Sequence, residues 1–357
     1  MIDSRGALRS YLKYGLLIGL LLGLVGGGGL LVVLPDAPET TQQQQRACVS
    51  PANEVGWNSS QPATADPIQT LSGSETMSTG NESSVRVQFR AERKRNSSVL
   101  PGVSHDNVLL RADEKTYLLS QYHCAHLLET DGERIPQSGG WETNRTDVFY
   151  EVKPPGTSID TMLRAEDRWY AYAQGAVFVS DSLTGDWTAY RLPEHLDDAG
   201  VYYEDQTFHM FYEAGNTTGL SGSAIGHATS SDGVSNWTEG QPVYESENGF
   251  KTGDYDVIEQ DGIYLIFADH TRVHPNYTVS LFATESLSSN FTHVGTVARP
   301  FRNDTAQPER GIQDATVRYD PTREAYVLYT HVHEERRRLH SSTLTIDVEN
   351  VSQAGSR

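Results

Sequence analysis

Lysine and cysteine are both scarce in this sequence, and each shortage narrows what the protein can be. The chain has five lysines, and its 47 acidic residues outnumber 28 basic ones, which gives a net charge of −19 at pH 7. Proteins that bind nucleic acid present a basic surface to the phosphates, so this composition excludes nucleic acid as a partner. A lysine-poor acidic surface is typical of halophilic proteins, because dissolved salt screens its self-repulsion. An ordinary acidic surface is the alternative.

The two cysteines, Cys48 and Cys124, are too few for a disulfide framework. They could pair in an oxidising compartment, although nothing in the sequence requires it. A further absence is helical periodicity, which we do not find anywhere after residue 35. The folded part of the chain is therefore expected to be all-β.

One long apolar run lies near the N-terminus, over residues 14–34. A helix of 21 residues spans about 30 Å, the thickness of a bilayer core. Basic residues precede the run and acidic residues follow it, so residues 1–13 should be cytoplasmic and the C-terminal domain extracellular. We expect a single-pass anchor in the cell membrane. A cleaved signal peptide is the alternative, although such segments are usually shorter and no small-residue cleavage site follows Leu34.

The chain after the apolar run has the composition of an exported glycoprotein. Residues 35–84 are rich in Ser, Thr, Gln and Pro, which predicts a flexible extracytoplasmic linker. Ten N-x-S/T sequons occur, none of them before the run, and they indicate a glycosylated outer surface. They begin at Asn58, Asn81, Asn96, Asn144, Asn216, Asn236, Asn276, Asn290, Asn303 and Asn350.

Beyond residue 85 one pattern occurs five times, for example as GIQDATVRYDPTREAYVLYTH at residues 311–331. Each copy has an aspartate, an apolar alternation, a polar turn and a second alternation that ends in aromatics. This pattern predicts a β-hairpin. The five aspartates are separated by 54, 38, 56 and 60 residues. They are Asp106, Asp160, Asp198, Asp254 and Asp314.

Further strands follow the hairpins, as in IGHATSSDGVSNWTEG at residues 225–240. Repeats of about 50 residues with four short strands are typical of β-propeller blades. We therefore predict an all-β, five-bladed propeller over residues 85–350, with a short tail at 351–357 and with LHSSTLTIDV (339–348) as the outer strand of the fifth blade. A β-sandwich would not explain the repeated position of the aspartates.

The repeated aspartates have two interpretations. The innermost strand of each blade lines the central channel, so these side chains should converge on one mouth. Clustered carboxyl groups repel one another, which raises some of their pKa values and lets one act as an acid while another stays ionised. An Asp before a strand also accepts backbone hydrogen bonds in a turn, and this structural role remains open for Asp254 and Asp314.

The Asp–hairpin–aromatic blade and the "ATSSDG" turn resemble those of the five-bladed propeller glycoside hydrolases of the family-43 type, which include arabinanases, β-xylosidases and related invertases. The resemblance covers residues 100–345. It implies a glycosidase that acts on an oligo- or polysaccharide, with Asp106 of blade one as base or nucleophile and Asp160 of blade two tuning its pKa. In that family a glutamate of blade three is the acid. Here Asp198 holds the position and Glu213 is the nearest glutamate, so the acid could be either.

Several other residues are candidate contacts for a carbohydrate. Trp169 and Tyr203 could stack on a sugar face, although aromatics at strand ends also pack between blades. The remaining candidates are Asp254, His270, Arg310 and Asp314. We expect no metal site among the histidines, because the pair His331 and His333 lacks a clear third ligand. No cofactor is expected, apart from a calcium or sodium ion held by carboxylates in the central channel.

Two other functions remain open. One is a non-catalytic propeller that binds carbohydrate or an envelope protein. The other is a relative of phosphorylases, which would need a basic phosphate pocket built from arginines such as Arg272, Arg299, Arg302 and Arg310. The sequence does not determine the oligomeric state.

Overall fold

The computed structural model describes residues 68–78, 84–100, 105–121, 125–130, 132–145, 148–149, 157–215, 222–246, 250–271, 277–300, 311–332 and 338–351. The predicted anchor at residues 14–34 lies outside these ranges, as does Arg310. Among the described residues there is no helix long and apolar enough to cross a membrane.

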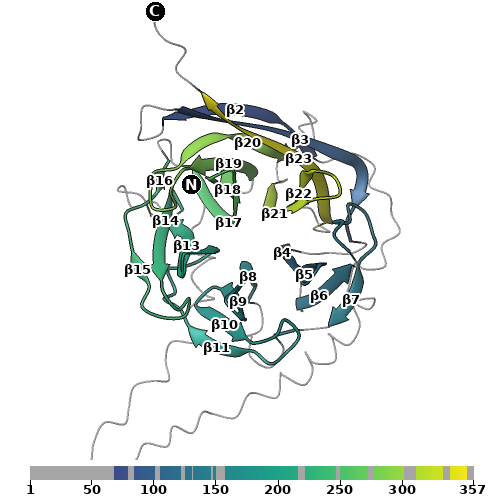
Figure 1. Ribbon diagram of the computed structural model, residues 1–357, viewed down its shortest axis with the longest axis vertical. Coiled ribbons are helices and arrows are strands. Elements are labelled where there is room, and N and C mark those ends of the chain that lie inside the picture. Colours follow the sequence, from purple (N-terminus) through teal and green to yellow (C-terminus); the bar gives the residue numbers. More distant parts are fainter. Residues whose placement is uncertain are drawn as a thin grey trace, which may run out of the picture. The chain divides into compact units, whose positions relative to one another are not determined.

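Five antiparallel sheets surround a common centre (Figure 1). Blade one consists of β4 (His105–Ala112), β5 (Lys115–Gln121), β6 (Ala125–Thr130) and β7 (Glu142–Arg145). Blade two consists of β8 (Thr161–Ala165), β9 (Arg168–Ala173), β10 (Ala176–Ser180) and β11 (Thr188–Arg191). In blade three, β12 (Gly200–Glu204), β13 (Thr207–Ala214) and β14 (Ala224–Ser230) are followed by β15 (Thr238–Glu239) and β16 (Tyr244–Glu245), which both pair with β14.

The last two blades combine strands from distant parts of the chain. Blade four consists of β17 (Lys251–Gln260), β18 (Ile263–Thr271), β19 (Thr278–Thr284), β20 (Thr292–Pro300) and β1 (Ile68–Thr70). Blade five consists of β21 (Ile312–Asp320), β22 (Ala325–Val332), β23 (Arg338–Val351), β3 (Ser84–Ser98) and β2 (Ser72–Ser78). The prediction of an all-β propeller with five hairpin-based blades is therefore confirmed.

Two predicted boundaries differ from the structure. Residues 68–78, predicted as the end of a flexible linker, form β1 and β2. The segment 339–348 is the third strand of blade five and not its outer strand, because β3 pairs with it from Val351↔Ser84 to His340↔Ser98. The physical reason is that the edge of β23 would otherwise be left unpaired, and β3 both completes its hydrogen bonds and buries Phe89 in the core.

The middle strands of the blades are buried on both faces. In β10, β14 and β19 nearly every residue is buried, so these strands do not alternate between core and solvent. The cause is that each blade packs between two neighbours, as Phe149 does against Phe178 and Trp187 at centroid distances of 5.4 and 4.8 Å. This packing holds the inner strands β4, β8, β12, β17 and β21 around the channel.

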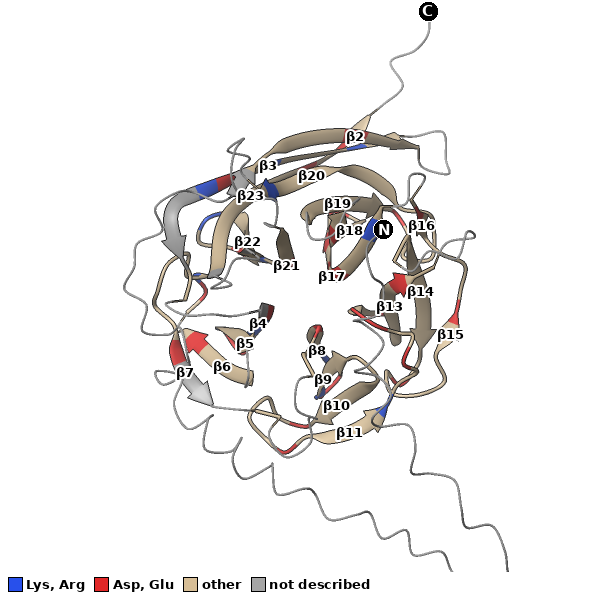
Figure 2. Cartoon of the chain, turned by 180° about the vertical axis from the view of Figure 1, so that it is seen from behind, with Lys and Arg blue, Asp and Glu red and all other residues tan. Residues whose placement is uncertain are grey.

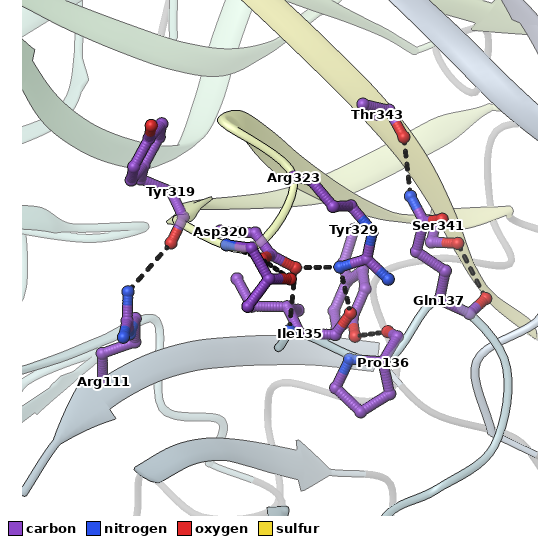
Figure 3. A network of polar contacts seen from close by, with 11 residues as sticks. Arg111, Ile135, Pro136, Gln137, Tyr319, Asp320, Arg323, Tyr329, Ser341 and Thr343 are labelled. Carbon is purple, nitrogen blue, oxygen red and sulfur yellow. Dashed lines mark hydrogen bonds and ion pairs between the residues drawn. The ribbon is translucent and has the colours of Figure 1, made fainter. Parts of the chain in front are cut away.

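Polar contacts join blade five to blade one and so close the ring (Figure 3). Asp320, at the end of β21, is fully buried and accepts a hydrogen bond from the backbone N–H of Ile135 (3.0 Å). Arg323 pairs with the same carboxylate and donates to the carbonyl of Ile135 (2.8 Å). Arg111 of β4 donates to the carbonyl of Tyr319 (3.3 Å). The ion pair between Asp320 and Arg323 and the hydrogen bonds to the backbone of Ile135 thus stabilise the contact between blades five and one, which we call the seam.

Candidate active site

The five repeated aspartates converge on the centre of the ring. Four of them line one pocket there, together with Asn107, Thr161, Tyr255 and Thr316: these are Asp106, Asp160, Asp254 and Asp314. The fifth, Asp198, lies beside them, since its charge raises the pKa of both Asp160 and Asp254. Figure 2 shows acidic residues at the central ends of the inner strands β4 and β8. The aspartates therefore converge on one site, as the sequence predicted.

The backbone at these aspartates explains part of the repetition. Four of them have a left-handed conformation, with φ of 47° at Asp106, 50° at Asp198, 48° at Asp254 and 55° at Asp314. Asp is one of the few residues that adopt this conformation readily. In β4, β17 and β21 a bulge places two residues of the inner strand opposite one of the second strand at this point. A bulge of this kind changes the direction of a side chain. The same aspartate therefore adopts the left-handed backbone that the bulge needs and points its carboxyl group toward the pocket.

The second strand of four blades supplies a polar residue next to the aspartate. These residues are Gln121, Glu213, Asp269 and His331, from β5, β13, β18 and β22. Gln121 donates hydrogen bonds to the backbone carbonyls of Asp106 and Ile159, and its own carbonyl oxygen accepts from Ile159 N–H (2.9 Å). It therefore ties the aspartate segment of blade one to that of blade two.

The other three partners act on carboxyl groups directly. Glu213 shares a side-chain hydrogen bond with Asp198. In blade five, Nδ1 of His331 lies 2.9 Å from Oδ2 of Asp314, and the same oxygen accepts the backbone N–H of Asp106 at 3.1 Å. Asp269 is fully buried beside Asp254, and burial is the largest cause that holds its pKa well above the usual range.

Burial dominates the electrostatics of the pocket. It is the largest cause that raises the pKa of Asp198 to about 8, followed by the charges of Asp197 and Glu213. Burial likewise holds the pKa of Asp160 and of Asp254 well above the usual range, and neighbouring aspartates add to the effect. A buried carboxyl group surrounded by like charges keeps its proton at neutral pH. The pocket therefore contains acids that can donate protons.

Asp197 fixes the position of the pair formed by Asp198 and Glu213. Its carboxylate accepts hydrogen bonds from the backbone N–H of Asp198 (3.0 Å) and from the side chain of Gln174 (2.7 Å). Its backbone carbonyl accepts the N–H of Glu213 (3.1 Å). Glycine is required close by, because a Cβ at Gly222 would collide with the Glu213 carboxylate. The pair is thus held by its own local network.

Comparison with solved structures shows which fold this is. A thermostable family-43 glycoside hydrolase superposes with a TM-score of 0.51 at 12% identity, covering 74% of this chain and 98% of that one. The xyloglucan PUL family-43 protein GH43B of Bacteroides ovatus gives 0.53 at 9% identity, covering 72% of this chain and 54% of that one. RS223 β-xylosidase gives 0.50 at 9% identity, covering 68% and 93%.

The fold is that of the family-43 glycoside hydrolases. The predicted resemblance is confirmed at this level, and identities of 9–12% show the fold alone. The chain spans about half the length of the Bacteroides ovatus protein. No family model matches the sequence, and no curated protein matches it.

Within this family-43 fold, the two aromatic residues predicted to contact sugar lie at the far end of their blades. Trp169 pairs with Arg164 at the end of the β8–β9 hairpin remote from Asp160, and it is 5% exposed within the core between blades one and two. Tyr203 packs on Phe208 at the corresponding end of blade three. Their strands run away from the mouth, so the side chains pack between blades and do not face the pocket.

Of the other residues predicted to contact a carbohydrate, two lie at the pocket. Asp254 and Asp314 line the pocket, as predicted. His270, at the end of β18, is buried; its Nδ1 lies 3.1 Å from Oγ of Ser280 and its ring packs on Phe250 at 4.6 Å. It therefore belongs to the core of blade four. Arg310 lies outside the described residues.

Sequence reasoning overlooked the partners on the second strands, above all Gln121 and Asp269. A signal for them does exist, because each lies on the second strand opposite the residue that precedes the aspartate: His105 pairs with Gln121 and Gly253 with Asp269. Pairing the two strands outward from the polar turn finds them. His331 was considered for a metal site, and its partner in the structure is Asp314.

Proposed function

We propose that the protein is a glycoside hydrolase that cleaves glycosidic bonds of an oligo- or polysaccharide with two carboxyl groups of this pocket. Such hydrolysis needs one protonated and one ionised carboxyl group on either side of the bond. The observation that carries the proposal is the convergence of the repeated aspartates on one central pocket, where burial and neighbouring charges raise the pKa of Asp198 to about 8. The family-43 fold supports the same conclusion.

Each carboxyl group has a proposed role. Asp198 is the acid that protonates the leaving oxygen, and the negative charge of Glu213 helps to keep the proton on Asp198 at neutral pH. Asp106, from blade one, is the base or nucleophile. Asp160 modulates this pair, because it is buried in contact with the charges of both Asp198 and Asp106.

Hydrolysis of a panel of aryl glycosides, measured at low and high salt, tests the proposal. Asp106→Asn and Asp198→Asn should each lower kcat by about 10²-fold or more, the usual contribution of a general acid or base. Asp205→Asn is the matched control, since Asp205 is an exposed turn residue with a left-handed backbone at the opposite end of blade three. Cleavage that survives Asp106→Asn unchanged would remove Asp106 from the mechanism.

A non-catalytic carbohydrate-binding propeller is the second candidate, and one observation favours it. The acid in register in blade three is an aspartate, one methylene shorter than glutamate. Binding of oligosaccharides by calorimetry with no reducing ends released would support this function and exclude hydrolysis.

We also propose that a calcium or sodium ion can bind between Asp106, Asp254 and Asp314. Hard cations prefer several oxygen ligands at 2.3–2.6 Å, and three carboxylates within 4.8 Å of one another fit that requirement. The contact between His331 and Asp314 orients one of these carboxylates. Calorimetric titration with calcium, compared between the wild type and Asp314→Asn, tests the site: equal affinity in both would exclude it.

We further propose that the domain is displayed on the outer side of the cell membrane by the apolar segment at residues 14–34. The charge asymmetry around this segment supports the orientation. The full chain should remain in the membrane fraction after an alkaline wash, and protease added to intact cells should release the propeller. Recovery of the full chain in the soluble fraction would contradict the anchor.

A further inference from the structure

One surface turn is built in the same way in blades two, three and four. It joins the third strand to the fourth and begins with a hydroxyl residue that donates a hydrogen bond to a carbonyl of the turn. Ser180 donates to Ser182 (2.8 Å) and Thr284 to Ser286 (3.0 Å), each two residues further along, whereas Ser230 donates to Ser235 (2.7 Å), five residues further along. The three turns thus share the position of the hydroxyl residue, although Asn236 in blade three has a left-handed backbone (φ 53°).

The sixth residue after that hydroxyl is exposed in all three turns. It is Asp186 in blade two, Asn236 in blade three and Asn290 in blade four. An aromatic residue follows each time and packs inward; Trp187 and Phe291 are 6% and 5% exposed. The aromatic anchors the chain and leaves the polar residue before it on the surface.

A threonine completes the pattern at the beginning of the fourth strand. Thr238 starts β15 and Thr292 starts β20, so Asn236 and Asn290 each begin an N-x-T sequon within a rigid turn. In blade two, Thr188 starts β11 in the same way, but Asp186 stands where the asparagine would be. The fold thus presents two sequons and one near-copy that lacks only the acceptor amide.

These turns lie on the face of the propeller opposite the acidic pocket. The first strand of a blade runs away from its aspartate, the second returns, and the third runs away again. The turn after the third strand is therefore at the far end of the blade. A bulky group attached there does not obstruct the pocket.

We propose that Asn236 and Asn290 are N-glycosylation sites and that their glycans cover the face opposite the pocket. In this reaction the side-chain Nδ2 forms a bond to the anomeric carbon of an oligosaccharide carried on a lipid phosphate. The bond from that carbon to the phosphate oxygen breaks, the lipid phosphate leaves, and Nδ2 gives up one proton. Both asparagines are exposed, as this transfer requires, and Nδ2 of Asn236 donates a hydrogen bond to the hydroxyl of Ser235, which is exposed as well (3.0 Å).

Mass spectrometry of glycopeptides tests the proposal on the full chain, produced in a host that exports and N-glycosylates it. Peptides with Asn236 and Asn290 should carry glycan, and Asn236→Gln and Asn290→Gln should each remove one glycan from the intact mass. The blade-two turn provides a gain-of-function test, because Asp186→Asn creates the sequon Asn-Trp-Thr in the same turn. This variant should acquire one additional glycan, which Asp186→Asn combined with Thr188→Ala should lose again.

The linker sequons Asn58 and Asn81 serve as an internal reference for export and transfer. Glycan on these residues but not on Asn236 and Asn290 would overturn the proposal, as would a chain without any N-linked glycan. Thermal unfolding of each variant shows whether a lost glycan reflects a lost acceptor or a misfolded blade. An Asp186→Asn variant that is folded but unmodified, while Asn236 and Asn290 are modified, would show that the shared turn is not what makes these sites acceptors.

Discussion

Asp198, which directly precedes β12, shares a hydrogen bond with Glu213 of β13, and the charge of Glu213 helps to raise the pKa of Asp198 to about 8. Burial of Asp198 is the largest cause, and the charges of Asp197 and Glu213 add to it. The two are not adjacent in sequence, and the hairpin register brings them together. The pair therefore links the fold to the proposed chemistry.

The pH dependence of hydrolysis should report this pair. If Asp198 is the acid, activity is lost as it ionises, so the alkaline limb of kcat/KM should have its midpoint near the pKa of about 8. Glu213→Gln removes a negative charge that favours the protonated form, so the pKa of Asp198 falls and the limb should move to lower pH. A pH profile of kcat/KM for both proteins checks this. An alkaline limb that stays in place in Glu213→Gln would show that the two carboxyl groups are not coupled.

Stability should decrease from pH 7 to pH 8 when no cation is added. The pKa of Asp198 is raised from 3.8 to about 8, and burial also raises the pKa values of Asp160, Asp254 and Asp269. In this range the unfolded chain has lost these protons while the folded protein still holds some of them, so the free energy of unfolding falls as pH rises. Burial lowers the pKa of four histidines, and their opposite effect is confined to lower pH: His209, His227, His270 and His293. Thermal unfolding at pH 7 and at pH 8 should give the higher Tm at pH 7.

Calcium should reverse this loss at the higher pH, because it binds ionised carboxylates of the folded state. Its addition should raise Tm more at pH 8 than at pH 5, and less in Asp254→Asn than in the wild type. A Tm that increases from pH 7 to pH 8 in the absence of calcium would contradict the electrostatic account of the pocket.

The seam between blades five and one should be sensitive to Asp320. Asp320→Ala leaves the N–H of Ile135 and the guanidinium of Arg323 without their buried acceptor. Removing one partner of a buried pair costs about 3–5 kcal/mol in the free energy of unfolding. Asp113→Asn, in an exposed pair with Arg164, is the control and should cost less than about 1 kcal/mol. Urea unfolding compares the two, and equal losses would show that the seam does not stabilise the ring.

The N-terminal strands should be needed for folding, although they precede the repeats. A chain that begins at residue 68 retains β1, β2 and β3 and should fold as the full chain does. A chain that begins at residue 99 lacks β3, which exposes Leu344 and Ile346 on β23 and leaves its edge unpaired. Circular dichroism and gel filtration should show an unfolded or aggregated product. A monomeric, cooperatively folding product would mean that blade five is stable without its outer strands.

The hairpins could be predicted because the residue pattern that specifies each one lies within a short segment of the sequence. Alternating apolar residues on both sides of a polar turn specify two paired strands, and five copies specify five blades around a channel. The convergence of the aspartates could be predicted from the same repetition. Each aspartate precedes the innermost strand of its blade, and these strands surround the channel. Four of the five line the pocket.

The partners of the aspartates were harder to predict. Asp269 and Gln121 are recognisable only once the pairing across each hairpin is known, and bulges at Asp106, Asp254 and Asp314 shift that pairing by one residue. Trp169 and Tyr203 are aromatic residues at strand ends, and from the sequence such residues can either stack on a sugar or pack between blades. In the structure they lie at the remote ends of blades two and three.

By itself, then, the sequence determined the position of the hairpin strands, the number of blades and the convergence of the acidic side chains. These features depend on a residue pattern that is complete within one hairpin and is repeated in each blade. The tertiary structure alone decided that β3 completes blade five and that Asp198 is buried where the charge of Asp106, from blade one, acts on it. Both depend on contacts between residues of different hairpins. The proton affinity of a carboxyl group is set by its burial and by the charges around it, and only the folded ring brings these together.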